Sequence, residues 1–154
     1  MSQPLTTLRV ALIAGPSGPI AAQLLELEGL LIQQPQVRLT RFENARCFID
    51  AMWQLDDPVP HFAVISAEPQ SDSGHDQPAL DGGLDCLENL RQLESGRLLP
   101  TILIAAQWTA EMLVQARKHQ AASCIGLPDD PIERLEVLTQ LVRYWCAINE
   151  PAQQ

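Results

Sequence analysis

The chain has 154 residues, 46% of them hydrophobic, which suits one domain with a full apolar core. Its 19 acidic and 10 basic residues give a formal net charge of −9, which argues against nucleic-acid binding because phosphate contacts require clustered Lys and Arg. No signal peptide is visible, and no apolar stretch approaches the roughly 20 residues of a membrane span. We expect a soluble, cytoplasmic single domain over residues 1–150, with a flexible tail at residues 151–154.

Apolar runs of strand length and segments with helical spacing alternate along the chain. In chain order they predict a strand at 8–14, a helix at 20–32, a strand at 37–40, a helix at 44–55, a strand at 62–66, a helix at 83–93, a strand at 100–105, a helix at 110–119, a strand at 124–127 and a helix at 131–148. This alternation predicts an α/β fold, a flavodoxin-like doubly wound parallel sheet with strand order 2-1-3-4-5. Thr109 and Asp130 are expected to cap the last two helices, with Pro131 at the first position of the final one.

Two sets of residues carry further expectations about packing. The apolar face of the helix at 44–55 consists of Cys47, Phe48, Ala51, Met52 and Leu55. The cysteines, which lack the spacing of a metal site, are Cys47, Cys86, Cys124 and Cys146. We expect reduced, packed thiols and neither a disulfide nor a bound metal.

The last helix carries two apolar stripes. One stripe consists of Leu135, Leu138, Val142 and Trp145, and the other of Val137, Leu141, Tyr144 and Ile148. One stripe is enough to dock a helix on a sheet, so the second indicates either a wide buried face or a partner subunit. We favour the partner subunit.

The ends of the apolar strands lack polar chemistry. The carboxyl ends of parallel strands are where this kind of fold normally places its functional side chains. Here the residues at these ends are Ala14, Gly15, Pro16, Ser66, Ala105 and Leu127. The sequence therefore resembles a catalytic scaffold from which the polar site has been removed.

Several segments resemble the receiver domains of two-component response regulators. Residues 80–91 (LDGGLDCLENLR) look like the opening of that family's third helix, and residues 100–104 (PTILI) look like its fourth strand. Leu127-Pro128 stands at the place of the family's Lys-Pro pair, where the family keeps a cis peptide. The ending at residues 142–145 (VRYW) is similar to that of the small stand-alone receivers that partner bacterial phytochromes, which tend to dimerise.

The resemblance assigns family roles to the strand ends, and none of the residues there matches its role. The metal-binding acidic pair falls within Ala14, Gly15 and Pro16, the phosphoacceptor Asp on Ser66, the switch hydroxyl on Ala105 and the phosphoryl-binding Lys on Leu127. Mg²⁺ requires hard oxygen ligands, and phosphoryl transfer requires metal and cationic charge to stabilise it. A neutral Ser hydroxyl without a base is a poor nucleophile.

These departures predict a pseudo-receiver that works without phosphorylation. We expect no enzymatic activity, no metal and no cofactor, and a stable domain whose melting temperature barely responds to Mg²⁺. The expected partners are a signalling protein, either a histidine kinase or a downstream regulator, and a second copy of the chain bound through the last helix. The candidate interface residues are Trp108, Leu141, Tyr144, Trp145 and Ile148.

Alternative interpretations stay open at several places. The emptied strand ends also suit a flavodoxin-like small-ligand sensor, and a remnant regulatory domain like those of transcription antiterminators is a further alternative. The loop at 68–79 is either a solvated acidic loop or a divalent-metal site, and residues 15–19 form either a rigid turn or a phosphate loop. Trp108 either anchors an interface or packs over the emptied pocket. Trp53 is expected in the core or at a helix flank, and His61 and His119 have no evident partners.

Overall fold

Five parallel strands form one sheet in the order β2-β1-β3-β4-β5. The structure is a computed structural model, and it describes residues 7–13, 20–54, 59–67 and 83–148, with residues 147 and 148 described by their backbone alone. The strands are β1 (Leu8–Ile13), β2 (Val37–Phe42), β3 (Phe62–Ser66), β4 (Thr101–Ala105) and β5 (Ser123–Gly126). The predicted fold class and strand order are confirmed.

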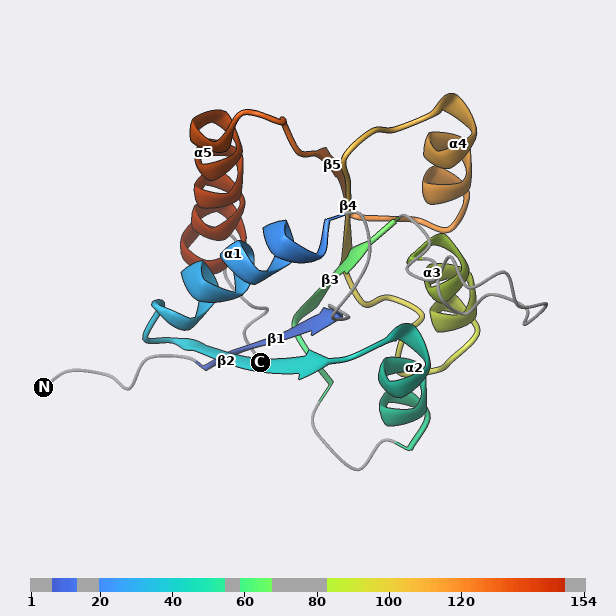
Figure 1. The fold of residues 1–154 in the computed structure, drawn as a ribbon. Helices are drawn as coiled ribbons and strands as arrows, with labels where there is room; N and C mark the ends of the chain where they lie inside the picture. Colours follow the sequence, from blue (N-terminus) through green and yellow to red (C-terminus); the bar gives the residue numbers. More distant parts are fainter. Residues whose placement is uncertain (1–6, 14–19, 55–58, 68–82, 149–154) are drawn as a thin grey trace, which may run out of the picture.

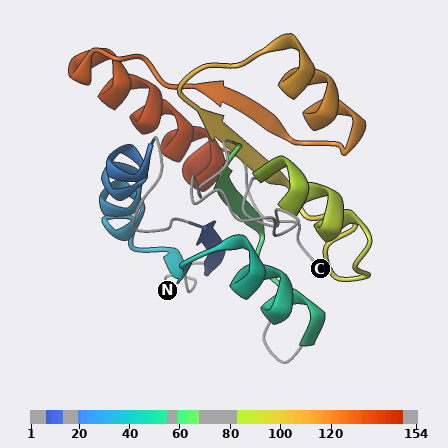
Figure 2. The same ribbon diagram turned by 45° about the vertical axis from the view of Figure 1, so that its right-hand side comes forward.

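Helices cover both faces of this sheet. They are α1 (Ala21–Ile32), α2 (Ala45–Gln54), α3 (Gly83–Arg91), α4 (Ala110–Lys118) and α5 (Pro131–Val142), followed by a π-helical turn, η1 (Arg143–Ile148). Figure 1 shows α1 beside α5 on one side, with α2, α3 and α4 on the other. Figure 2 gives the same arrangement from a second direction. Each group of helices encloses its own half of the hydrophobic core.

The burial of the strands follows their place in the sheet. β3 and β4 are buried along their whole length, because helices cover both of their faces and neighbouring strands flank them. The edge strands β2 and β5 alternate between partly buried and exposed residues over most of their length. Both edges therefore present polar or small side chains to solvent.

Helix starts follow local signals that the sequence already carries. The Thr109 hydroxyl accepts a hydrogen bond from the Met112 N–H at the start of α4. The Asp130 carboxylate accepts one from the Glu133 N–H, and Pro131 occupies the first turn of α5. Both predicted caps are confirmed.

Two packing predictions are corrected by the structure. On α2, Phe48 and Met52 are buried, but Cys47 and Ala51 are exposed, so the buried face is narrower than predicted; Leu55 lies outside the described residues. Cys86 and Cys146 are buried thiols, whereas Cys47 and Cys124 are exposed, and all four are free. Cys47 and Cys124 sit on a helix flank and on an edge strand, where an apolar neighbourhood in sequence does not produce burial.

The last helix changes register near its end. Its α-helical part stops at Val142, and η1 continues as a π-helix, a form in which hydrogen bonds span five residues. Trp145 is buried with its ring centroid 5.3 Å from that of Phe62, and the Cys146 carbonyl accepts a hydrogen bond of 2.9 Å from Gln36 Nε2. The end of the helix is thus fastened to the amino edge of the sheet. Within the described residues, no helix is long and apolar enough to cross a bilayer.

Candidate functional site at the carboxyl edge of the sheet

Three of the positions singled out in the sequence meet at the carboxyl edge of neighbouring strands. Ser66 ends β3, Ala105 ends β4, and Leu127 directly follows β5. The Leu127 N–H donates to the Ala105 carbonyl at 3.0 Å, and the Ala67 N–H donates to the Ile104 carbonyl at 2.8 Å. Ser66 is 2% exposed, Ala105 is fully buried and Leu127 is 5% exposed. The sequence correctly predicted that these residues lie along one edge.

Leu127 turns its side chain into the core rather than toward the edge. It packs within the cluster that α1 and α5 enclose, together with residues such as Leu24 and Leu138. The described chain holds no cis peptide bond, so the bond between Leu127 and Pro128 is trans and the implied cis peptide is wrong. A trans bond is the ordinary preference of an X–Pro pair unless surrounding contacts select the cis form.

The start of α3 presses against the end of β3. A Cβ atom on Gly83 would overlap the carbonyl oxygen of Ser66, so the approach of the two backbones requires glycine at this position. This close approach helps to keep Ser66 out of solvent. The Ser66 side chain is therefore poorly accessible to a phosphoryl donor.

The rest of the predicted site cannot be placed. The degenerate metal positions Ala14, Gly15 and Pro16 lie outside the described residues, and so do the loop residues Glu68, Asp72, His75 and Asp76. Across the part of the chain that the structure describes, no group of three His, Cys, Asp or Glu residues could hold a metal ion. Asp85, in the first turn of α3, has its pKa raised by burial and by the nearby Glu88.

Trp108 packs onto the edge strand instead of standing free. Its indole Nε1–H donates a hydrogen bond of 2.9 Å to the Ile125 carbonyl, and its Cδ1 lies 3.6 Å from the point where a Cβ of Gly126 would sit. The ring is partly buried against the core that α2, α3 and α4 enclose. Of the two interpretations of Trp108, the geometry favours packing, here over β5.

The other predicted interface residues separate into buried and exposed. Leu141 and Trp145 are buried in the core of the single chain, so they offer little surface to a partner, and the two apolar stripes largely merge into one wide buried face. Tyr144 is 52% exposed, with its ring packed edge-on to Trp145. The side chain of Ile148 lies outside the described residues.

An exposed apolar pair on α5 was not recognised as a candidate from the sequence. Ile132 and Leu135 are both exposed, and their spacing of three residues places them on one side of the helix. Leu135 was assigned to the docking stripe. The signal that could have found the pair is this i, i+3 spacing in the first turns of α5.

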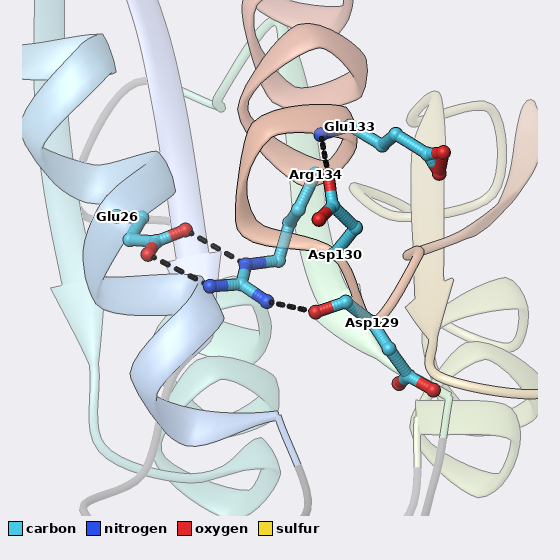
Figure 3. A network of polar contacts seen from close by, with 5 residues as sticks. All are labelled: Glu26, Asp129, Asp130, Glu133 and Arg134. Carbon is cyan, nitrogen blue, oxygen red and sulfur yellow. Dashed lines mark hydrogen bonds and ion pairs between the residues drawn. The ribbon is translucent and has the colours of Figure 1, made fainter.

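Arg134 joins α5 to α1 beside this edge (Figure 3). Its Nε and Nη2 donate to the two carboxylate oxygens of Glu26 at 3.0 and 3.3 Å, and its Nη1 donates to the Asp129 carbonyl at 3.3 Å. The hydrogen bonding that the Arg134 guanidinium donates to the Glu26 carboxylate is the main reason that the pKa of Arg134 is raised. These hydrogen bonds of Arg134 fix the start of α5 relative to α1.

Three aromatic residues outside the edge were also singled out in the sequence. The His61 Nδ1 accepts a hydrogen bond of 2.9 Å from the Arg9 N–H, and the His119 Nε2 lies 3.9 Å from a carboxylate oxygen of Glu88. Both histidines therefore have partners that the sequence did not reveal. Trp53 is 71% exposed, so of its two predicted places, the core and a helix flank, the structure supports the flank of α2.

Comparisons with known proteins decide the fold family. No protein-family model and no curated protein matches the chain. Among solved structures, a phosphorylated cyanobacterial phytochrome response regulator, RcpA, is similar with a TM-score of 0.74 and 6% identity, over 96% of this chain and 100% of that one. The Mn²⁺-bound response regulator Rcp1 gives 0.73 and 10%, over 94% and 99%. A response regulator of red-light signalling in R. palustris gives 0.67 and 17%, over 96% and 100%.

This chain has the fold of a response-regulator receiver domain. The likeness extends over nearly all of the chain and nearly all of each of these receivers, at low sequence identity. RcpA was seen phosphorylated and Rcp1 with Mn²⁺ bound. In the present chain, Ser66 and Ala105 end β3 and β4, and Leu127 follows β5.

Proposed function

We propose that this chain is a pseudo-receiver that acts without phosphorylation, as a protein–protein interaction module in signal transduction. The observation that carries the proposal is that Ser66, Ala105 and Leu127, at the carboxyl ends of β3, β4 and β5, are buried and uncharged. Phosphoryl transfer depends on metal ions and cations placed around the developing charge. These strand ends offer instead a buried hydroxyl, a methyl group and a leucine whose side chain turns into the core. We therefore assign the domain a non-catalytic role that resides in its surfaces.

Incubation with acetyl phosphate and Mg²⁺ tests this proposal directly. Intact-mass spectrometry should show no added phosphate, while a receiver with Asp at the end of its third strand gains one in the same mixture. Millimolar Mg²⁺ should leave the melting temperature unchanged, because no described carboxylates converge to bind it. Phosphate incorporation that disappears in a Ser66→Ala variant, or a melting shift of several degrees with Mg²⁺, would overturn the proposal.

The proposed module includes a homodimer formed through α5. Ile132 and Leu135 place two exposed aliphatic side chains on one flank of the helix, and Tyr144 adds an exposed aromatic ring on η1. Burial of such side chains against a second copy would stabilise a dimer by the hydrophobic effect. Leu141 and Trp145, which are already packed inside, are no longer part of the proposed interface.

Light scattering at tens of micromolar tests the dimer. The wild-type chain should have twice the monomer mass, and Leu135→Glu should return it to the monomer. Leu98→Glu is the matched control, because Leu98 is exposed in the connection after α3, away from α5. A wild-type monomer, or a dimer that survives both Leu135→Glu and Ile132→Glu, would refute this interface.

We propose that the signalling partner is a histidine kinase or a downstream regulator and that Tyr144, which also belongs to the proposed dimer surface, contributes to binding it. Tyr144→Ala should reduce what the protein captures from its native cell without changing its fold, because the ring is half exposed. Trp108→Ala is no longer a clean interface probe, since Trp108 packs on β5. Capture that is unchanged by Tyr144→Ala would remove Tyr144 from the interface.

A further inference from the structure

A hollow lies between the ends of α2 and α3, away from the edge that carries Ser66. It has a volume of about 210 Å³ and is lined by Met52, Trp53, Leu93, Glu94 and Ser95. Helices of a parallel α/β fold run opposite to the strands, so these helix ends lie toward the amino edge of the sheet. The hollow is therefore separate from the receiver site.

The two walls of the hollow are tied to each other. The Ser95 hydroxyl donates a hydrogen bond of 2.7 Å to the Met52 carbonyl, which joins the turn after α3 to the last turn of α2. Leu93 is buried beneath this contact, and Met52 is buried beside it. Trp53 and Glu94 are thus carried on segments that are fixed relative to one another.

One wall presents an open aromatic ring. Trp53 is 71% exposed, whereas Trp145 is buried and Trp108 is partly buried and hydrogen bonded. Within the described residues, Trp53 has no hydrogen bond or ring contact. The face of an indole ring attracts cations, and this attraction amounts to about 0.5–2 kcal/mol depending on how far the cation is desolvated.

The other wall presents a carboxylate. Glu94 is exposed and forms no ion pair with any described residue, including Arg97 three residues later. The carbonyl end of α2 also points to this region, and its last turn carries no basic residue to offset the partial negative charge of the helix end. The Glu94 carboxylate and the carbonyl end of α2 are therefore negative groups beside the hollow, in a chain whose net charge is −9.

We propose that this hollow binds an arginine side chain of a partner protein. A planar guanidinium can stack on the Trp53 ring while its N–H groups donate to the Glu94 carboxylate, a combination that the compact ammonium group of lysine does not match. The apolar walls of Met52 and Leu93 accept the methylene stem. The site consists of residues other than those of the proposed dimer surface and of the pseudo-receiver edge. An experiment that refutes arginine binding would therefore leave both of those proposals intact.

The test is a titration of the full chain with the capped peptide Gly-Arg-Gly-Arg-Gly and with its citrulline counterpart, which is neutral and nearly the same shape. The arginine peptide should shift the amide and indole NMR signals of Trp53 and of its neighbours in the hollow, with a millimolar Kd, and should quench tryptophan fluorescence. The citrulline peptide should do neither.

Variants then assign the binding to the two walls. Trp53→Leu and Glu94→Gln should each weaken binding roughly fivefold or more, which corresponds to about 1 kcal/mol. Glu111→Gln, an exposed carboxylate on α4, is the matched control and should stay close to wild type. Far-UV circular dichroism confirms that each variant is folded. No binding by wild type, equal binding of the citrulline peptide, or shifts centred on the acidic start of α5 would overturn the proposal.

Discussion

Replacement of Trp108 by phenylalanine isolates the contact that fastens the loop after β4 to the edge strand β5. The indole N–H is the donor in the 2.9 Å hydrogen bond to the Ile125 carbonyl, and phenylalanine keeps an aromatic ring but has no donor. Helix α4 begins directly after this loop and has Ala116 as its buried residue. The position of α4 on the sheet therefore depends on Trp108 as well as on the packing of Ala116 and Met112.

The expected magnitude follows from two contributions. Loss of a neutral hydrogen bond destabilises a protein by about 0.5–1.5 kcal/mol, and here water can reach the edge strand and partly replace the donor. The smaller ring of phenylalanine loses some apolar contact, which adds about 0.5 kcal/mol. Trp108→Phe should therefore lower the free energy of unfolding by about 1–2 kcal/mol, or the melting temperature by roughly 2–8 °C.

Urea unfolding followed by far-UV circular dichroism measures this change, because fluorescence would mix the signals of all three tryptophans. Trp53→Phe is the matched control and should leave stability within about 0.5 kcal/mol, since Trp53 is mostly exposed. Hydrogen exchange of the amides in β5 should also become faster in Trp108→Phe. Equal stability of Trp108→Phe and wild type, with unchanged exchange in β5, would refute the reasoning.

Three further predictions concern single residues. The pKa of His61 is lowered by burial and by Arg9, so the unfolded chain binds the proton more readily than the folded chain. The contribution of neutral His61 to stability should be complete above pH about 6.5 and be lost as the pH falls through the folded pKa. His61→Gln should flatten this part of a stability–pH curve, whereas an unchanged curve would contradict the prediction. Gln120 has φ 63°, a left-handed conformation that glycine adopts without strain, so Gln120→Gly should raise stability by about 0.5–1 kcal/mol in urea unfolding, and a loss of stability would contradict this. Gly83→Ala should lower the free energy of unfolding by about 3 kcal/mol or more, because the new Cβ meets the backbone at the end of β3. Gly29→Ala in α1, where the new Cβ has open space, should raise it by about 0.5–1 kcal/mol. The same effect of both substitutions in urea unfolding would refute the argument.

Prediction from the sequence succeeded where the signal is local or periodic. The alternation of apolar strands and amphipathic helices predicted the sheet and its strand order, because each element must bury one face and parallel strands need helical crossovers. The caps at Thr109 and Asp130 were predictable because a side chain and the backbone N–H that it binds lie three residues apart. Ser66, Ala105 and Leu127 were placed along one edge because parallel strands end on the same side.

The residues whose positions were predicted wrongly depend on partners that are distant in sequence. Trp108 takes its position from Ile125, 17 residues later, and the turn after α5 takes its position from Gln36, 110 residues before Cys146. No periodicity within either segment contains that information. The same holds for Trp145, which the sequence placed at an interface and the structure packs against Phe62.

The sequence by itself determined the fold class, because hydrophobic periodicity is a property of each segment taken alone. Only the tertiary structure decided which apolar side chains remain outside. It turned Leu127 inward, buried the face of α5 that had been assigned to a partner, and left Trp53 beside Glu94 on the surface. The physical reason is that burial depends on what the rest of the chain places opposite a residue, and this is fixed only when the helices dock on the sheet.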